Sequence, residues 1–139
     1  MRFQYCSDGA RILISGALDT DLAPLQNLFE RLGRERNEFS LSNLPFIVAI
    51  DQLDIVAKST SGTNQKSSLL SEHTLFLRAN SPMTFERIQT SERWMDLVEL
   101  IDPIIKSTAP CHQYLTESIN DDAIIVLSKG EYSSEGMLL

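Results

Sequence analysis

Residues 3–14 read Phe-Gln-Tyr-Cys-Ser-Asp-Gly-Ala-Arg-Ile-Leu-Ile, two β-prone runs that flank an Asp-Gly pair. Asp-Gly between such runs is typical of a two-residue β-hairpin turn, because both turn positions need a positive φ. The pattern predicts strands at about 2–7 and 10–16. The chain therefore begins with an antiparallel pair.

Two helices are expected farther along the chain. Asp19 or Asp21 is suited to cap the first, and the leucine and phenylalanine side chains of residues 22–32 follow helical spacing. A second apolar stripe runs over residues 91–105. Pro103 lies within it and is expected to kink or end that helix.

The other apolar segments suit strands. The continuous run at 46–50 is expected to be a central strand covered on both faces. Residues 51–52 are either a tight turn or a bulge within one long strand. Ser81-Pro82 resembles a helix start, with a cap followed by proline at the first position. Further strands are predicted near 39–41, 53–58, 73–79, 113–115 and 123–127.

Helices and strands do not alternate regularly in this order, which favours an α+β fold over a doubly wound α/β fold. The economical arrangement is a single, mostly antiparallel sheet with the two main helices packed on it. Residues 1–139 are predicted to form one domain. A flexible loop is expected at about 59–71 and a frayed tail at about 133–139.

Charge is concentrated in the last third of the chain. The 139 residues include 19 acidic and 12 basic side chains, for a formal charge of -7. Nine of the acidic and three of the basic residues fall within 92–139. This balance disfavours a general nucleic-acid binder, whose surface is usually basic. A surface of one sign serves solubility, or it attracts a basic protein partner.

Composition also bounds the cellular setting. No apolar run approaches the ~20 residues of a membrane span, and the first residues lack the pattern of a secretory signal. Cys6 and Cys111 are the only cysteines, so we expect reduced thiols in a cytoplasmic protein. His73 and His112 are far apart and have no zinc-finger spacing.

Searches for catalytic and cofactor motifs are negative. The sequence lacks a dinucleotide fingerprint, a phosphate-binding loop, a nucleophile elbow and the zincin pattern. Cys111 and His112 are adjacent, but neighbours on a strand point to opposite faces and rarely act together. We therefore expect no cofactor and no metal ion.

Three carboxylates on the second helix are candidates for partner contact. Glu92, Asp96 and Glu99 recur at spacings of four and three and lie along one helix face. They form either a solvated face or a docking strip for a cationic partner. Trp94, on the apolar stripe, is either a core residue or an interface anchor. Tyr114 and Tyr132, near acidic residues, suit recognition of an Arg- or Lys-rich surface.

The end of the chain resembles a known family. Residues 111–115 read Cys-His-Gln-Tyr-Leu, and residues 123–132 read Ala-Ile-Ile-Val-Leu-Ser-Lys-Gly-Glu-Tyr. This pair of segments is similar to the C-terminal hairpin of small bacterial immunity proteins, which neutralise toxins of contact-dependent growth inhibition and other polymorphic toxin systems. The resemblance covers about 22 of the 139 residues and leaves the first 90 unmatched.

The resemblance implies a small cytoplasmic inhibitor without a catalytic site. Its partner would be a basic, nuclease-type toxin whose functional surface it occludes, with no direct contact to nucleic acid or membrane. It would be a monomer or a weak homodimer. From the placement of charge, the expected contacts are Glu92, Asp96, Glu99, Glu117, Asp121, Asp122, Glu131 and Tyr132.

Two other functions stay open at this point. One is a small enzyme that uses His112 with a carboxylate, which predicts a concave pocket holding that histidine and a perturbed group. The other is a non-catalytic subunit or adaptor, for example a homodimer formed through an exposed strand edge.

Overall fold

The structure is a computed structural model of the 139-residue chain, and it describes residues 1–6, 9–35, 38–49, 52–60, 75–80, 82–116, 121–132 and 138. In chain order the elements are β1 (Arg2–Cys6), β2 (Arg11–Gly16), α1 (Asp19–Arg34), β3 (Glu38–Ser40), the 3₁₀ turn η1 (Leu41–Asn43), β4 (Val48–Ala49), β5 (Asp54–Thr60), β6 (Leu75–Asn80), β7 (Met83–Thr90), α3 (Ser91–Lys106), β8 (Cys111–Tyr114) and β9 (Ile124–Lys129).

The predicted N-terminal hairpin is confirmed. β1 and β2 pair antiparallel, with Phe3 opposite Ile14. The connection is longer than the predicted two-residue turn, because β1 ends at Cys6, which pairs with Arg11 at the start of β2. The positive φ values in the described part of this connection, 86° and 48°, belong to Gly9 and Ala10. Asp8 lies outside the described residues.

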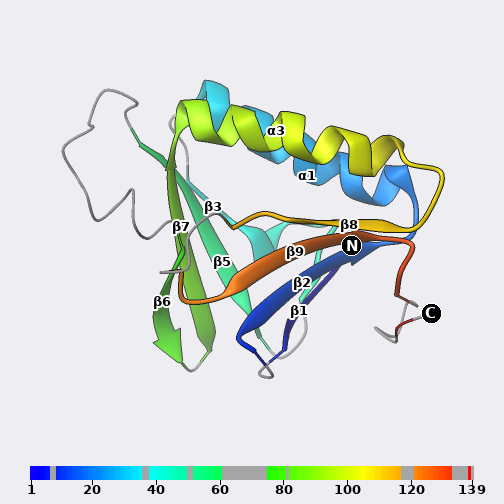
Figure 1. Cartoon of the computed structure of the whole chain (residues 1–139). Helices are drawn as coiled ribbons and strands as arrows, with labels where there is room; N and C mark the ends of the chain where they lie inside the picture. The colour runs from blue at the N-terminus through cyan, green and yellow to red at the C-terminus, as the bar shows by residue number, and fades with distance from the viewer. Residues whose placement is uncertain are drawn as a thin grey trace.

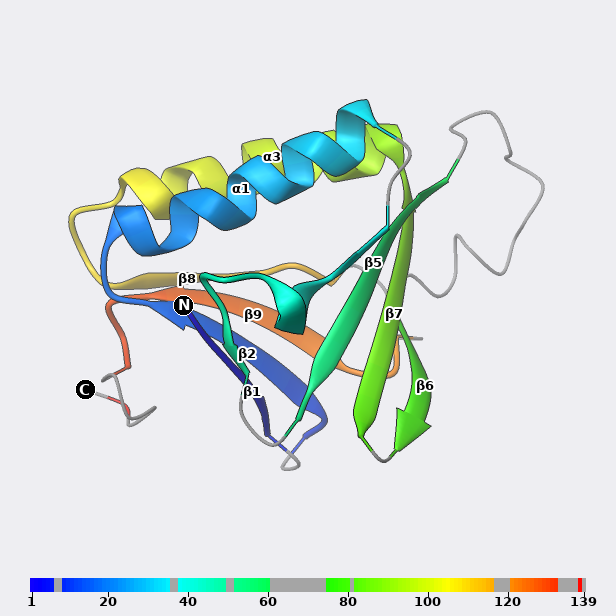
Figure 2. The same ribbon diagram turned by 180° about the vertical axis from the view of Figure 1, so that it is seen from behind.

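The two predicted helices also form, and they lie side by side over the strands (Figures 1 and 2). At the start of α1, the carboxylate of Asp21 accepts hydrogen bonds from the backbone N–H groups of Ala17 and Leu18, at 3.0 and 2.9 Å. The prediction that Asp19 or Asp21 is the cap is wrong, because Leu18 occupies the N-cap position and Asp19 is the first residue of the helix. Asp21, at the third helical position, instead bonds back to the backbone that precedes the helix. The helices approach closely at Gly33, where a Cβ atom would lie 2.5 Å from the Met95 sulfur.

The expectation that Pro103 ends the second helix is wrong, because α3 continues through this residue to Lys106. Pro103 lies on the exposed side of the helix. Water on that side can hydrogen-bond the carbonyl group that proline leaves without a donor, which lowers the cost of the substitution.

The strands form two mixed sheets. The predicted α+β class is therefore confirmed, and the prediction of a single, mostly antiparallel sheet is wrong. One sheet has the order β4-β1-β2-β9-β8, and the other has the order β3-β5-β7-β6. β2 pairs parallel with β9, and β5 pairs parallel with β7. After α1 the chain adds β3 to the second sheet and crosses back to the first with β4. It then completes the second sheet with β5, β6 and β7 and returns to the first with β8 and β9. Apolar alternation specifies which face of each strand is buried, but it does not specify which strands pair.

The core lies between the inner faces of the two sheets and beneath both helices. Tyr5 on β1 and Phe85 on β7 bring the sheets together, with ring centroids 5.9 Å apart. Trp94 of α3 is 1% exposed, stacks against Phe29 of α1 at 5.4 Å and donates its indole N–H to the Lys58 carbonyl at 2.9 Å. Trp94 is therefore a core residue, one of the two roles expected for it.

Residues 46–50 do not form the expected central strand. β4 contains only Val48 and Ala49, pairs with β1 at the edge of its sheet, and leaves Val48 61% exposed. The apolar run instead reflects the burial of Ile47 after the 3₁₀ turn. Gln52 has a φ of 58°, and β4 and β5 belong to different sheets, so this position lies in a turn and not in a bulge.

Ser81-Pro82 is also not a helix start. It lies between β6 and β7, which pair antiparallel as a hairpin. Ser81 is outside the described residues, as are residues 61–71 of the expected loop and most of the expected tail. Ser59 and Thr60, which were expected to begin that loop, belong to β5. Proline at a turn position and proline at a helix start share the same φ, which explains the wrong prediction.

Candidate functional site

The carboxylates on α3 are placed by a helix that is anchored on its other side. The Thr90 hydroxyl accepts a hydrogen bond from the Arg93 N–H at 3.2 Å and caps the helix. Trp94, Leu97 and Ile101 bury the inner face. Glu92, Asp96 and Glu99 are exposed, as their spacing predicts. We call these three residues the acidic strip.

No basic side chain balances the acidic strip within the described residues. The neighbouring Asp102 differs, because it accepts a salt bridge from Lys106 at 2.7 Å and a hydrogen bond from Gln26 of α1 at 3.1 Å. These hydrogen bonds and the Lys106 charge outweigh burial and lower the pKa of Asp102 below its ordinary value of 3.8. Thus α3 holds one carboxylate that stabilises the helix pair and three that contribute no such contact.

Asp121 and Asp122, two of the predicted partner contacts, instead join the two sheets. Asp121 accepts a hydrogen bond from the Leu75 N–H at 3.0 Å, and Asp122 accepts one from the Leu77 N–H at 2.6 Å. The Asp122 N–H donates to the Leu75 carbonyl at 3.1 Å. The segment before β9 therefore covers the edge of β6. Glu117, another predicted contact, lies outside the described residues.

Asp121 also lies close to a buried cation that the sequence analysis missed. Arg87 on β7 is 3% exposed and donates a hydrogen bond to the Leu115 carbonyl. Burial lowers the pKa of Arg87 to about 10, against the raising effect of Asp121 and with a further lowering by Arg93. Asp121 thus offsets part of the cost of burying this charge.

His112 and Glu131 come together at the far end of the second hairpin. The Nδ1 atom of His112 lies 3.0 Å from Oε2 of Glu131, and the Ser128 hydroxyl donates to Oε1 of Glu131 at 2.6 Å. Burial alone would raise the pKa of Glu131. The hydrogen bonds from Ser128 and His112 and the charge of His112 lower it below its ordinary value of 4.5. An ionised carboxylate only accepts hydrogen bonds, so Nδ1 of His112 is the donor and Nε2 is left for a ligand.

These residues border a hollow of about 220 Å³ on the outer face of the five-stranded sheet. We call it the histidine hollow. Tyr114 and Tyr132 also line it, and the His112 and Tyr114 rings meet edge to face at 5.9 Å. Strand pairing explains the cluster, because His112 lies opposite Ser128 and Glu131 follows three residues later. The register between β8 and β9, had it been known at the sequence level, would have placed His112 and Glu131 close together.

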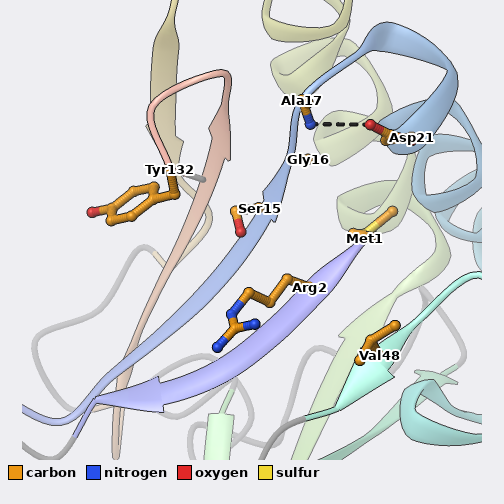
Figure 3. Close-up of a pocket in the computed structure, with 8 residues that line it drawn as sticks. All are labelled: Met1, Arg2, Ser15, Gly16, Ala17, Asp21, Val48 and Tyr132. Atoms are coloured by element: carbon orange, nitrogen blue, oxygen red, sulfur yellow. Dashed lines mark hydrogen bonds between the residues drawn. The ribbon is translucent and has the colours of Figure 1, made fainter. Parts of the chain in front are cut away.

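A second hollow of about 250 Å³ adjoins Tyr132 where β1 and β2 meet the start of α1 (Figure 3). Arg2 and Ser15 are cross-strand partners on its floor. The Arg2 side chain donates to Gln4 at 3.3 Å, and the Asp21 carboxylate is held by the backbone at the start of α1. The charged groups at this hollow therefore already serve the fold.

The predicted contacts do not form one patch. The acidic strip lies on the solvent face of α3, Asp121 and Asp122 lie at the edge of β6, and Glu131 and Tyr132 lie on the outer face of the five-stranded sheet. Cys111 and His112 point to different sides: Cys111 is half-buried, with its sulfur 3.9 Å from the Ile104 carbonyl, and His112 is exposed.

Among the described residues, no group of three His, Cys, Asp or Glu side chains is arranged to hold a metal ion. Neither of the described helices combines the length and the apolar character that crossing a bilayer requires.

No match was found in comparisons of the chain with models of protein families, with curated proteins and with solved structures.

Proposed function

We propose that this chain is an immunity protein that binds a basic bacterial toxin and covers its functional surface. The acidic strip carries the proposal: Glu92, Asp96 and Glu99 are exposed, aligned on one helix, and without a basic partner in the part of the chain described by the structure. As such an inhibitor the protein would act in the cytoplasm. Neither a membrane nor a nucleic acid is required as a partner.

The strip has the physical properties of a docking surface for cations. Like charges at spacings of three and four repel one another and slightly destabilise the helix. A cationic partner removes that repulsion when it binds. The strip also raises the encounter rate with a basic surface, and this effect weakens with added salt. Leu100, 37% exposed beside the strip, offers apolar contact area that slows dissociation.

The direct test is co-purification with the product of the gene immediately upstream. We expect a salt-sensitive complex that suppresses a growth-inhibiting activity of that product. In the variant Glu92→Gln/Asp96→Asn/Glu99→Gln, affinity at low salt should fall roughly 10-fold or more, because steering and ion pairing are both lost. The variant should keep the same folded structure.

A matched control separates local charge from net charge. Thr20→Lys/Asn27→Lys/Thr108→Lys changes the net charge by the same amount at three exposed positions outside α3. We expect this control to bind the partner nearly as well as the wild type. Equal weakening in both variants would contradict docking at the strip, and failure of the unmodified chain to bind or neutralise the upstream product would contradict the immunity function.

One observation favours a second candidate, a small enzyme that uses His112 with Glu131. The histidine borders a concave hollow, and its Nδ1 lies 3.0 Å from the Glu131 carboxylate, an arrangement that suits a general base. A panel of carboxylic and phosphoric esters would test it. Turnover that is lost in His112→Gln and kept in the acidic-strip variant would support the enzyme. Equal turnover by wild type and His112→Gln, or none by either, would contradict it.

A further inference from the structure

The histidine hollow combines an apolar floor with polar groups at opposite ends. Leu13 on β2 and Val126 on β9 are paired neighbours that form its floor, and both are less than a tenth exposed. Tyr114 pairs with Val126 from the other side. The floor and this tyrosine therefore form one row across three strands. This row is an apolar surface against which a ligand can pack.

Arg11 and His112 occupy the rows on either side of that floor. Arg11 precedes Leu13 by two residues on the same face of β2, and His112 precedes Tyr114 by two residues on the same face of β8. β2 runs parallel to β9 and β8 runs antiparallel to it. A step of two residues back along β2 and a step of two residues back along β8 therefore lead to opposite sides of the floor. The two rows are separated by roughly 13 Å along the strands, a distance that the two side chains shorten by reaching inward.

The charges of the hollow favour an anion at the Arg11 end. Arg11 is exposed and has no ion pair with any described residue. Glu131 is the acidic side chain that borders the hollow, and both of its oxygens already accept hydrogen bonds, from His112 and from Ser128. Ser128 is 0% exposed, so its hydroxyl holds the Glu131 carboxylate from a buried position on β9. A ligand meets one unbalanced guanidinium and one ring nitrogen, Nε2 of His112.

We propose that the histidine hollow binds a small organic acid, with its anionic group at Arg11, an apolar body over Leu13 and Val126, and a hydrogen-bonding group at Nε2 of His112. Tyr114 and Tyr132 suit an aromatic body, because rings pack edge to face or offset against one another. The volume of about 220 Å³ lies below that of a drug-sized site, so the ligand is small. This site is on a different surface from the acidic strip and does not depend on it.

A set of three ligands with one ring separates the contributions. 4-Hydroxyphenylacetate carries the charge, the ring and the hydroxyl; 4-hydroxyphenylacetamide lacks the charge; phenylacetate lacks the hydroxyl. Each is titrated at millimolar concentration into the isotope-labelled full chain and followed by backbone amide NMR shifts. We expect the acid to shift residues of β2, β8 and β9 around the hollow. The amide should bind roughly 10-fold more weakly, since a charge-assisted hydrogen bond is lost.

Variants assign each end. Arg11→Gln should remove the preference for the acid over the amide, and His112→Phe should remove the preference for the hydroxylated acid over phenylacetate. Arg34→Gln, at a 71% exposed arginine on α1, is the control and should bind as the wild type does. Equal binding of acid and amide, absence of shifts around the hollow with either acid, or an effect of Arg34→Gln as large as that of Arg11→Gln would overturn the proposal.

Loss of partner binding in the acidic-strip variant has no bearing on this site. That variant should bind the acid with unchanged affinity. An immunity function that fails its test leaves the acid site standing, and an acid site that fails leaves the strip unaffected.

Discussion

The three carboxylates of the acidic strip and the two before β9 carry the same charge in the same third of the chain, but their surroundings are opposite. Glu92, Asp96 and Glu99 face solvent and support no other described part of the fold. Asp121 and Asp122 accept backbone hydrogen bonds from β6 and link the two sheets. An acidic residue is therefore a candidate for partner contact only where the fold does not already use its carboxylate.

The largest effect expected from this comparison is on stability. Asp121→Ala/Asp122→Ala leaves the N–H groups of Leu75 and Leu77 without these acceptors and removes the charge near Arg87. We expect the free energy of unfolding to fall by about 1–2 kcal/mol, mainly from the part-buried Leu75 N–H, because water can replace the acceptor of the exposed Leu77 N–H. Urea unfolding at neutral pH measures the change.

Two variants sharpen that result. Asp121→Asn/Asp122→Asn keeps an oxygen acceptor at both positions and should recover part of the loss. Glu92→Ala/Asp96→Ala removes two carboxylates from the acidic strip and should cost little. If Glu92→Ala/Asp96→Ala lowered the free energy of unfolding as much as Asp121→Ala/Asp122→Ala, the two regions would not differ as described.

The pH dependence of α3 gives a smaller effect. Asp102 has a lowered pKa in the folded state, so its hydrogen bonds and ion pair stabilise the fold above its ordinary pKa of 3.8. This contribution is lost as pH falls below 3.8 through the folded-state pKa. Asp102→Asn should therefore be less stable than the wild type at pH 7, and the gap should close in strong acid. Asp96→Asn serves as the control, because the Asp96 carboxylate is exposed and forms no hydrogen bond or ion pair with a described residue, and it should not lose stability at pH 7.

The sequence predicted the elements better than their assembly. Apolar spacing and Asp-Gly placed the first hairpin, and helical periodicity placed α1 and α3. Strand pairing was missed, because β9 joins β2 across more than 100 residues and nothing local specifies that partner. The apolar run at 46–50 was misassigned for a related reason, since burial of Ile47 needs only a short edge segment.

The candidate site was predicted in the same uneven way. Helical spacing correctly placed Glu92, Asp96 and Glu99 on one exposed face. Local composition gave no sign that Asp121 and Asp122 face β6, because their hydrogen-bond donors lie about 45 residues earlier in the chain. The contact of His112 with Glu131 depends on the β8–β9 register, which fixes which side chains share a face.

The smallest predicted effect concerns the strip itself. Neutralising its second and third members with Asp96→Asn/Glu99→Gln should raise the free energy of unfolding, because each like-charge pair costs about 0.2–0.5 kcal/mol. Glu92 is left unchanged, since a carboxylate in the first turn favours the helix. Thermal unfolding at low ionic strength measures the gain, which should shrink as salt is added. A marked loss of stability would mean that the fold uses these carboxylates after all.

The central claim, that the acidic strip is a docking surface, is tested most directly by the association rate with the upstream gene product. Glu92→Gln/Asp96→Asn and Asp121→Asn/Asp122→Asn remove the same net charge from the two regions. For the variant at Glu92 and Asp96 we predict slower association at low salt and a rate that converges with that of the wild type at high salt. For the variant at Asp121 and Asp122 we predict a rate near that of the wild type. Equal slowing by both pairs, or by neither, would contradict the claim.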